Sequence, residues 1–405
     1  MSRRTPLRLF LAAFGQPGHA FPMLALGAEL ARRGHEVTYE TWTRWREPVQ
    51  ANGMRFVAAP EYPVFPTPER SVKPYEAVVH ATAQTRPALA AAQPDVVVHD
   101  ILTMAPALAA ELEGVAAATL IPHVYPVGQS GCPPYSLGAR MPRTKVGATL
   151  WRGFDRPVAK GLSQGRAELN HARGQLGLAP VSHFFGGLSR QLCLVGTFPQ
   201  LEYPRPWPAH VQVVGPLMWE PPFETVAPPP GDEPLVLVAP STAQDPDHRL
   251  LRACLAGLAG EPVRVLATWN RRPLAEPLVV PANARLVEWL SYAQTMPGCT
   301  LVICHAGHGT LARALACSCR VLAVPHAGDM AENAARADWA GAGVRLPWPL
   351  LGPGTLRLAA RRALGTPSLG VVAAQLSAWA RRNDGAARAA DLVEQLALRR
   401  RGGPS

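Results

Sequence analysis

At 405 residues the chain is longer than one ordinary hydrophobic core, so its length predicts two domains with a cleft between them. Hydrophobic residues make up 48% of the sequence and charged residues 17%, which excludes a disordered or fibrous protein. The net charge of +11 comes from scattered arginines without a basic, aromatic-rich stripe, so nucleic-acid binding is not expected, although a positive potential would attract an anionic nucleotide.

The N-terminal residues resemble a signal peptide, because basic residues precede an apolar run. The run is short and passes directly into Gly15-Gln16-Pro17-Gly18-His19, so we interpret residues 7–14 as a first strand. No apolar stretch of about 20 residues follows anywhere, and no membrane span is expected. Seven cysteines without paired spacing indicate a reducing compartment, so we expect a cytoplasmic protein.

The first half of the chain alternates between strand and helix patterns, which predicts a parallel sheet covered by helices. Apolar spacing indicates a helix that Gly34 ends, and a second helix follows the fourth strand. The predicted strands are 7–14, 36–41, 55–59, 95–99 and 116–121, and the predicted helices are 21–33 and 103–113.

Two segments of the first half, 62–75 and 125–160, lack periodicity and contain prolines, glycines and aromatic residues. Long irregular segments in a compact domain are often binding loops, so we expect a ligand-binding role for them. An ordinary hydrophobic lid would have the same composition. The aromatic candidates are Tyr62, Phe65, Tyr75 and Tyr125, with further aromatic residues at Tyr135, Trp151 and Phe154.

Proline density rises over 201–233, which predicts a linker between an N-terminal domain (1–200) and a C-terminal domain (234–378). Alternation of strands and helices restarts after the linker. The predicted fold class is therefore α/β, with two Rossmann-like, doubly wound domains that face each other across a cleft. The strands expected in the second domain are 235–239, 263–268, 285–289, 301–304 and 321–324.

The C-terminal segment 370–401 has a helical pattern that is interrupted near Asn383-Asp384-Gly385. Its last part, 379–405, either caps the second domain or crosses back to the first.

His19 follows the first predicted strand, at the sheet edge where open α/β folds bind ligands. A neutral imidazole there can accept a proton from a hydroxyl group, and a carboxylate on its other nitrogen would stabilise the imidazolium that forms. Asp100 closes the strand 95–99 at the same edge and is the best-placed candidate. As alternatives, His19 is a surface or capping histidine and Asp100 caps the next helix.

The segment from His305 to Thr310 lies between a predicted strand and a predicted helix. Gly307 and Gly309 would let the backbone approach a phosphate, and the free N–H groups of a helix start attract negative charge. The His305 imidazole and the Thr310 hydroxyl would add donors for a diphosphate. Glycine-rich turns of this kind are common even without ligands.

Asp329 follows the strand 321–324, where its carboxylate could accept hydrogen bonds from two sugar hydroxyls or cap the next helix. A zinc site is an alternative for the histidines and cysteines of this half. Their CxC spacing is unusual and the glycines favour a phosphate-binding turn, so no metal is expected. The ligands of that alternative are Cys304, His305, His308, Cys317 and Cys319.

Four segments stand in a specific order: Gly18-His19 with Pro22, Arg33-Gly34-His35-Glu36-Val37-Thr38, the turn from His305 to Thr310, and Pro325 through Asn333 with Gly341-Ala342-Gly343. Together they resemble the GT-B inverting glycosyltransferases of family 1, which include bacterial natural-product glycosyltransferases and UDP-sugar transferases of plants and animals. The resemblance spans nearly the whole chain. It implies that the N-terminal domain (1–200) binds the acceptor and that the C-terminal domain (234–378) binds the nucleotide sugar. A flat, apolar acceptor would fit the aromatic loops, with Tyr62, Phe65, Tyr75 and Tyr125 as the acceptor-binding candidates.

The resemblance implies that His19 is the general base and Asp100 its partner, in a direct displacement that inverts the anomeric carbon. It implies a nucleotide-sugar co-substrate without a further cofactor or metal, because His305, Thr310 and the helix dipole would neutralise the diphosphate. Trp289 matches the position that stacks on the nucleobase, with a core tryptophan as the alternative, and Ser241 or Thr242 matches a phosphate-binding hydroxyl. The donor-binding candidates are Thr242, Trp289, Leu290, His305, Gly307, Gly309, Thr310, Arg313, Asp329 and Met330.

Two positions depart from the family pattern. Arg313 stands where the family usually carries a ribose-binding glutamate, and Met330 stands where it carries glutamine. Both changes remove polar contacts to the donor, which suits a deoxyribose nucleotide and a sugar with fewer hydroxyls. We therefore predict a dTDP-deoxysugar donor, although Arg313 could instead make a new charged contact.

The predicted enzyme is thus an inverting, metal-independent hexosyltransferase that moves a deoxysugar to a hydroxyl of a small apolar natural product. Its arginine-rich, lysine-poor composition suggests a GC-rich bacterium, consistent with antibiotic biosynthesis. Alternatives are a UDP-hexose-dependent glycosyltransferase, a non-catalytic glycosyltransferase-like auxiliary protein, and a GT-B epimerase, against which the lack of an acidic cluster argues. A homodimer is left open.

Overall fold

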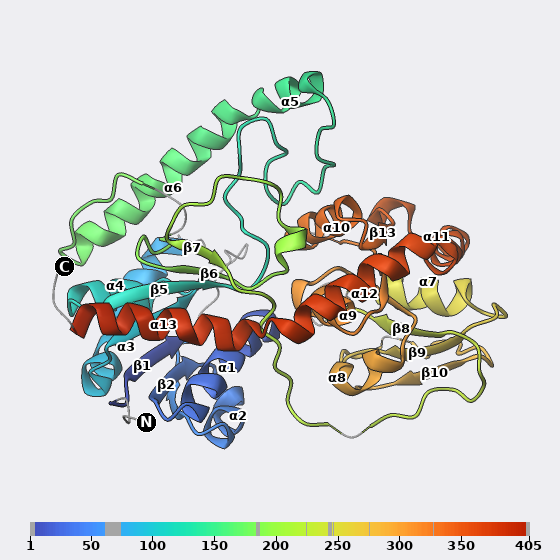
Figure 1. Cartoon of the computed structure of the whole chain (residues 1–405), viewed down its shortest axis with the longest axis horizontal. Helices are drawn as coiled ribbons and strands as arrows, with labels where there is room; N and C mark the ends of the chain where they lie inside the picture. The colour runs from blue at the N-terminus through green and yellow to red at the C-terminus, as the bar shows by residue number, and fades with distance from the viewer. Residues whose placement is uncertain are drawn as a thin grey trace.

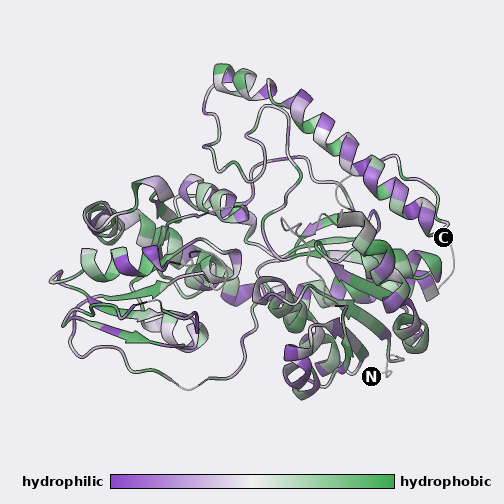
Figure 2. Ribbon diagram, turned by 180° about the vertical axis from the view of Figure 1, so that it is seen from behind, coloured by the Kyte–Doolittle hydropathy of each residue, from purple (hydrophilic) through white to green (hydrophobic). Residues whose placement is uncertain are grey.

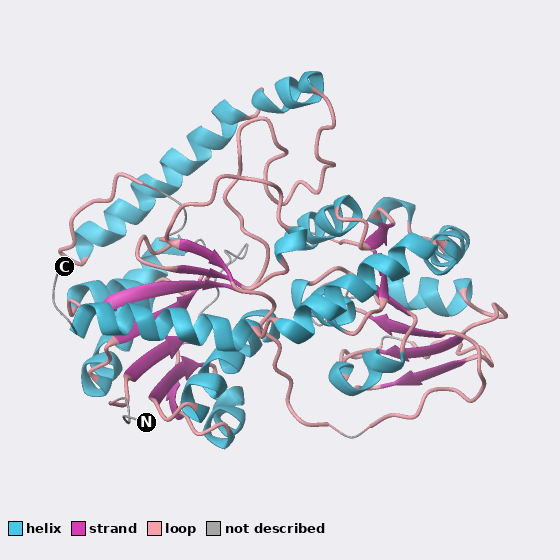
Figure 3. Cartoon of the chain, in the orientation of Figure 1, coloured by secondary structure: helices cyan, strands magenta, loops and turns pink. Residues whose placement is uncertain are grey.

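The computed structural model describes residues 5–60, 74–183, 187–223, 225–241, 245, 247–274, 276–326 and 328–401, without the side chains of 74–76 and 401. Two parallel sheets, each covered by helices, lie next to one another (Figure 1; Figure 3 separates helices from strands). This arrangement confirms the predicted fold of two Rossmann-like domains. Tyr62, Phe65 and Thr242 lie outside the described residues, as does the side chain of Tyr75.

The first sheet has seven strands in the order β3-β2-β1-β4-β5-β6-β7. The strand order reverses between the adjacent strands β1 and β4, and such a switch point opens a crevice at the carboxyl edge of a sheet. Strands β2 and β5 have the bounds that the sequence predicts. The strands are β1 (Arg8–Ala12), β2 (Glu36–Thr41), β3 (Arg55–Ala58), β4 (Val96–Asp100), β5 (Ala116–Ile121), β6 (Cys193–Val195) and β7 (Val211–Val213).

The helices of the first domain cover both faces of this sheet. Helix α1 buries Met23 and Leu26 against Leu9 and Leu11 of the central strand, which fixes the start of the helix at the sheet edge. The elements are α1 (Pro17–Arg32), η1 (Thr43–Trp45), α2 (Arg46–Ala51), α3 (Pro74–Ala92), α4 (Ala105–Leu112), α5 (Lys145–Arg152), α6 (Asp155–Gln175) and η2 (Pro199–Leu201).

The second sheet has six strands in the order β10-β9-β8-β11-β12-β13, and its switch point lies between β8 and β11. The strands are β8 (Leu235–Ala239), β9 (Arg264–Thr268), β10 (Ala284–Val287), β11 (Leu301–Cys304), β12 (Arg320–Ala323) and β13 (Gly343–Arg345). The helical elements are α7 (Arg249–Gly257), α8 (Tyr292–Thr295), η3 (Met296–Gly298), α9 (His308–Ala316), α10 (Asp329–Trp339), η4 (Trp348–Leu350), α11 (Pro353–Gly365) and α12 (Pro367–Arg382).

Helix α13 (Gly385–Arg401) leaves the second domain after a break at Asn383 and lies along the first domain (Figure 1). It contacts α1, β4 and β5, and Ala390 and Val393 belong to the core of the first domain. Arg33 of the loop after α1 forms an ion pair with Glu394 at 2.9 Å. The chain therefore connects the two domains twice.

Three element predictions need correction. Helix α1 begins at Pro17, not at residue 21, because proline is tolerated in the first turn of a helix, and His19 is therefore helical. The segment 125–160, predicted to be irregular, contains α5 and the start of α6. Strand β7 lies inside the predicted linker 201–233 and pairs with β6, so part of that segment belongs to the first sheet.

Candidate active site

His19 and Asp100 meet at the carboxyl edge of the first sheet. Asp100 is the last residue of β4 and is fully buried, and His19 lies in the first turn of α1 with 19% of its side chain exposed. His19 Nδ1 lies 2.7 Å from Asp100 Oδ2, and Asp100 Oδ1 accepts a hydrogen bond of 2.9 Å from the Leu102 backbone N–H. With Nδ1–H donated to the carboxylate, Nε2 carries the lone pair that can accept a proton.

The protonation of His19 reflects two opposing effects. Burial lowers the pKa of His19, but the attraction and hydrogen bond of Asp100, with a smaller contribution from Asp329, raise this pKa above its ordinary value of 6.5. A carboxylate that holds the imidazolium in this way makes the imidazole a stronger base. The pair can therefore take a proton from a bound hydroxyl.

A second imidazole, His123, lies in the loop after β5 with its ring centroid 6.4 Å from that of His19. Its Nδ1 lies 2.8 Å from the Val124 carbonyl oxygen and 3.2 Å from the Tyr135 hydroxyl, so Nδ1 carries the proton. Burial lowers the pKa of His123, which keeps it neutral. Sequence reasoning missed His123, although its position just after a strand of the same sheet edge was a usable signal.

Two further aromatic side chains that the sequence analysis did not select stand beside His19. Phe14, just after β1, lies edge-on to the His19 ring at 6.2 Å, and Trp42, just after β2, lies 4.9 Å from the Phe14 ring. Both are partly exposed. They form an apolar wall next to the reactive imidazole.

In the second domain, β11 runs into the start of α9 as the sequence predicts. Gly307 caps the helix, and His308, Gly309 and Thr310 form its first turn. An added Cβ at Gly307 or Gly309 would meet no atom within 4 Å, so the backbone there borders open space. The N–H groups of a first turn have no partner inside the helix and attract anions, which suits a diphosphate.

His305 does not present its imidazole to that space, contrary to the predicted contact with a diphosphate. The residue is 1% exposed, its Nδ1 accepts the Ser241 backbone N–H at 2.9 Å, and its Nε2 lies 3.4 Å from Asp245 Oδ2. Its observed role is to join the loop after β8 to the loop after β11. The sequence could not show this, because Ser241 and Asp245 are about 60 residues away.

Asp329, at the start of α10, is the residue of the second domain whose charge reaches the first-domain site. Its carboxylate acts electrostatically on both His19 and His123, and Asn333 Nδ2 donates to it at 3.3 Å. His308 also crosses between the domains, because its Nε2 lies 3.2 Å from the Gly196 carbonyl oxygen. The edge of the first sheet at His19 and the start of α9 therefore lie next to one another, across the cleft predicted between the domains.

Tyr125 is not an acceptor-binding residue of this cleft, because it is 5% exposed and belongs to the core. Its ring packs 5.4 Å from Trp207, and its carbonyl oxygen accepts a hydrogen bond from Arg336 of α10. Arg336 also forms buried ion pairs with Glu202 and Glu332. This cluster holds the two domains together beside the cleft.

Residues 252–394 match the family model described as "Erythromycin biosynthesis protein CIII-like, C-terminal domain". The chain is 28% identical to 4'-demethylrebeccamycin synthase of Lentzea aerocolonigenes, over 96% of this chain and 99% of that protein. It is 27% identical to O-mycaminosyltylonolide 6-deoxyallosyltransferase of Streptomyces fradiae, over 96% and 98%. The solved structure of glycosyltransferase VinC in complex with dTDP has a TM-score of 0.69 at 20% identity, covering 97% of this chain and all of that one. The chain is a glycosyltransferase of the GT-B fold, similar over nearly its whole length to natural-product glycosyltransferases.

In this glycosyltransferase Trp289 follows β10 and is partly exposed, with its ring 5.3 Å from that of Phe223 and the Arg271 guanidinium 5.3 Å from its centroid. The indole therefore belongs to a small cluster of planar groups, in which the Phe223 ring is tilted by 56°. Leu290, its neighbour, is 2% exposed and belongs to the core of the second domain, contrary to its predicted role in donor binding.

Arg313 of α9 contacts the interdomain segment. Its Nη2 donates to the Trp219 carbonyl oxygen at 3.2 Å, and its Nε lies 3.8 Å from Glu220 Oε2. Glu220 in turn accepts the backbone N–H groups of Tyr292 and Ala293 at the start of α8. Arg313 therefore forms a charged contact within the protein. Met330, next to Asp329, is partly buried.

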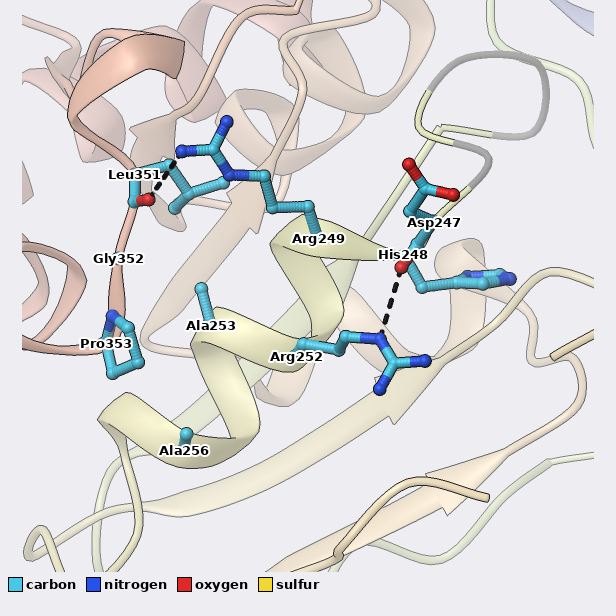
Figure 4. Close-up of a pocket in the computed structure, with 9 residues that line it drawn as sticks. All are labelled: Asp247, His248, Arg249, Arg252, Ala253, Ala256, Leu351, Gly352 and Pro353. Atoms are coloured by element: carbon cyan, nitrogen blue, oxygen red, sulfur yellow. Dashed lines mark hydrogen bonds between the residues drawn. The ribbon is translucent and has the colours of Figure 1, made fainter. Parts of the chain in front are cut away.

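A cavity of about 550 Å³ lies elsewhere on the second domain, between α7 and the start of α11 (Figure 4). Arg249 donates to the Leu351 carbonyl oxygen there, and Arg252 donates to that of Asp247. Of the predicted donor-binding residues that the structure describes, none lines this cavity. It is separate from the candidate active site.

Within the described ranges, no three His, Cys, Asp or Glu side chains are grouped so that they could hold a metal ion. The helices of the same ranges include none with the length and hydropathy needed to cross a bilayer.

Proposed function

We propose that this glycosyltransferase moves a deoxysugar from a dTDP donor to a hydroxyl group of a small apolar natural product, with inversion at the anomeric carbon. The observation that carries the proposal is the 2.7 Å contact between His19 Nδ1 and Asp100 in the cleft that Asp329 and the start of α9 share.

The residues suit a single displacement. The acceptor hydroxyl gives its proton to His19 Nε2 while its oxygen forms a bond to the anomeric carbon from the face opposite the nucleotide. The bond from the anomeric carbon to the phosphate oxygen breaks, and the electron pair leaves with dTDP. Asp100 stabilises the imidazolium, and the first-turn N–H groups of α9 stabilise the diphosphate. Asp329 accepts hydrogen bonds from the sugar hydroxyls.

The dTDP donor is supported by Arg313. An arginine has no carboxylate to accept a hydrogen bond from a ribose 2'-hydroxyl at the position where the family carries glutamate, and its contacts with Trp219 and Glu220 direct the guanidinium to the interdomain segment. VinC was solved with dTDP, and a relative from Streptomyces fradiae is named as a 6-deoxyallosyltransferase.

The apolar acceptor is supported by the surroundings of the base. Phe14, Trp42 and Tyr135 place aromatic surface close to His19 and His123. Planar apolar groups stack on such rings, and the His123 ring adds a fixed polar group for a second acceptor oxygen.

Calorimetric titration with dTDP and UDP tests the donor, and we expect dTDP to bind at least tenfold more tightly. Equal affinities would contradict the deoxyribose argument and favour a UDP-hexose donor. Incubation with a dTDP-6-deoxyhexose and a panel of polyketide and aromatic aglycones tests the transfer, with the product detected by mass spectrometry. The proton coupling constant of the new anomeric centre reports inversion.

A further inference from the structure

Helices α5 and α6 form an arm that extends past the rest of the molecule (Figures 1 and 2). Helix α5 has no buried residue, and α6 buries only Leu169, Ala172 and Arg173 near its C-terminal end. Every residue from 152 to 160 is exposed. Isolated helices of this length are marginally stable in water, so the free part of the arm gains from a surface on which it can lie.

The exposed part of the arm is amphipathic. Val146, Leu150, Phe154 and Val158, the apolar stripe, follow one another at intervals of four residues and are 71%, 72%, 46% and 40% exposed. Residues four apart lie on one side of a helix, and the backbone bond from Val158 N–H to the Phe154 carbonyl carries the helical path across the junction of α5 and α6. The Trp151 ring lies 5.3 Å from that of Phe154 and widens the stripe.

The polar side of the arm is cationic. At about 100° per residue, Lys145 and Arg152 of α5 lie about 220° and 200° around that helix from Leu150. Arg156 and Lys160 of α6 lie about 160° and 200° around their helix from Val158, so all four cations are on the side away from the stripe. Asp155 is the single carboxylate between residues 145 and 160, and it accepts a hydrogen bond from Ser130. Long cationic side chains can reach past an apolar face towards anionic groups, so the arm has the pattern of helices that lie in a membrane interface.

The size of the stripe argues against a protein partner. From Val146 to Val158 the helix rises about 18 Å, so a stripe about 10 Å wide covers roughly 200 Å². A stable protein partner covers about 800 Å² on each side. A second copy of the chain would also bring two cationic arms together. A flat anionic surface needs neither a large complementary area nor a matching shape, and it can reach an arm that extends from the body.

We infer that the arm docks on an anionic lipid bilayer, with the apolar stripe among the acyl chains and the four cationic side chains at the headgroups. The benefit of such docking rests on the proposed function. An apolar acceptor partitions into bilayers, so a docked enzyme would be close to its acceptor. The loop that carries His123 and Tyr135 leads directly into α5, so docking would bring the acceptor side of the cleft close to that reservoir.

Flotation with vesicles of phosphatidylcholine and phosphatidylglycerol (7:3), against pure phosphatidylcholine, tests the inference on the full chain. We expect at least tenfold greater partitioning into the anionic vesicles, lost in 0.5 M salt. The double substitution Leu150→Gln with Phe154→Gln should reduce it at least tenfold. Leu358→Gln with Val371→Gln, which removes two apolar side chains of similar exposure (66% and 56%) from α11 and α12, should leave it unchanged.

A second pair of variants tests the charge. Arg156→Gln with Lys160→Gln should weaken binding, whereas Arg362→Gln with Arg388→Gln, which removes two exposed cations from α11 and α13, should not. Arm variants that bind vesicles like the wild type would overturn the inference. So would a wild-type dimer that the arm variants dissociate, without vesicle binding, because a second copy would then cover the stripe. Binding of dTDP, measured on the same samples, reports folding and tests the donor half of the proposed function separately.

Discussion

The two walls of the cleft, the sheet edge at His19 in the first domain and the start of α9 in the second, differ in the groups that we propose act on the substrates. One presents a side chain and the other presents backbone. In the first domain the proposed proton acceptor is a side chain, His19, whose pKa is raised mainly by the Asp100 carboxylate 2.7 Å away. In the second domain His305 is buried, and the surface that borders open space is the backbone of Gly307 and Gly309. Turnover should therefore fall when a side chain is removed from the first wall, and dTDP binding should weaken when a side chain is added to the second.

The largest effect is expected from His19→Ala. Removing the proton acceptor should lower kcat about 1000-fold, within the usual range for a general base, and leave the Kd for dTDP unchanged. Steady-state kinetics measures kcat, and calorimetric titration measures the Kd for dTDP. His171→Ala provides the matched control, because His171 is exposed on α6 and bonds to Gln175 one turn away. A His19→Ala enzyme with full turnover would mean that another group, such as His123, accepts the proton.

The next effect is expected from Asp100→Asn, with a loss of about 100-fold in kcat. The wild-type rate should rise with pH through the raised pKa of His19, since only the neutral imidazole accepts a proton. Without the carboxylate this pKa falls, so the acidic limb of the kcat/KM profile should move to lower pH. An unchanged limb would show that Asp100 does not set the pKa of the catalytic base.

On the second wall, Gly309→Val should weaken dTDP binding about 30-fold, because its side chain would enter the open space beside the helix start. Gly354→Val is a close control: Gly354 is also the second residue of a helix that a glycine caps and is likewise followed by threonine. It also has no neighbour within 4 Å. Equal weakening by both substitutions would trace the effect to helix stability instead of phosphate contact.

The smallest effect concerns the contact between the walls. Burial lowers the pKa of His308 to about 3, so the folded chain binds fewer protons at this site than the unfolded chain below pH 6.5. Its contribution to stability therefore decreases as the pH falls, by about 2 kcal/mol at pH 5. Urea unfolding at pH 7.5 and 5.0 measures how much the free energy of unfolding falls between the two pH values. This decrease should be smaller for His308→Gln than for the wild type. Equal differences would place His308 in a more hydrated interface.

Much of the fold could be predicted because strands of a buried parallel sheet are short apolar runs. The bounds 36–41, 116–121, 235–239 and 301–304 agree with β2, β5, β8 and β11. The arm was missed because Gly147, Gly153 and Pro157, residues of low helix propensity, interrupt its apolar stripe. Strand β7 was missed because it is three residues long and follows a run of prolines.

The sequence by itself determined the fold and the meeting of His19 with Asp100, because strand order in a doubly wound sheet brings the residues after β1 and β4 to one edge. Only the tertiary structure decided that His305 and Tyr125 are turned inward, that Arg313 pairs with Glu220, and that His123 joins the cleft. The direction of each of these side chains depends on contacts with residues distant in the sequence, and a local sequence pattern does not reveal such contacts.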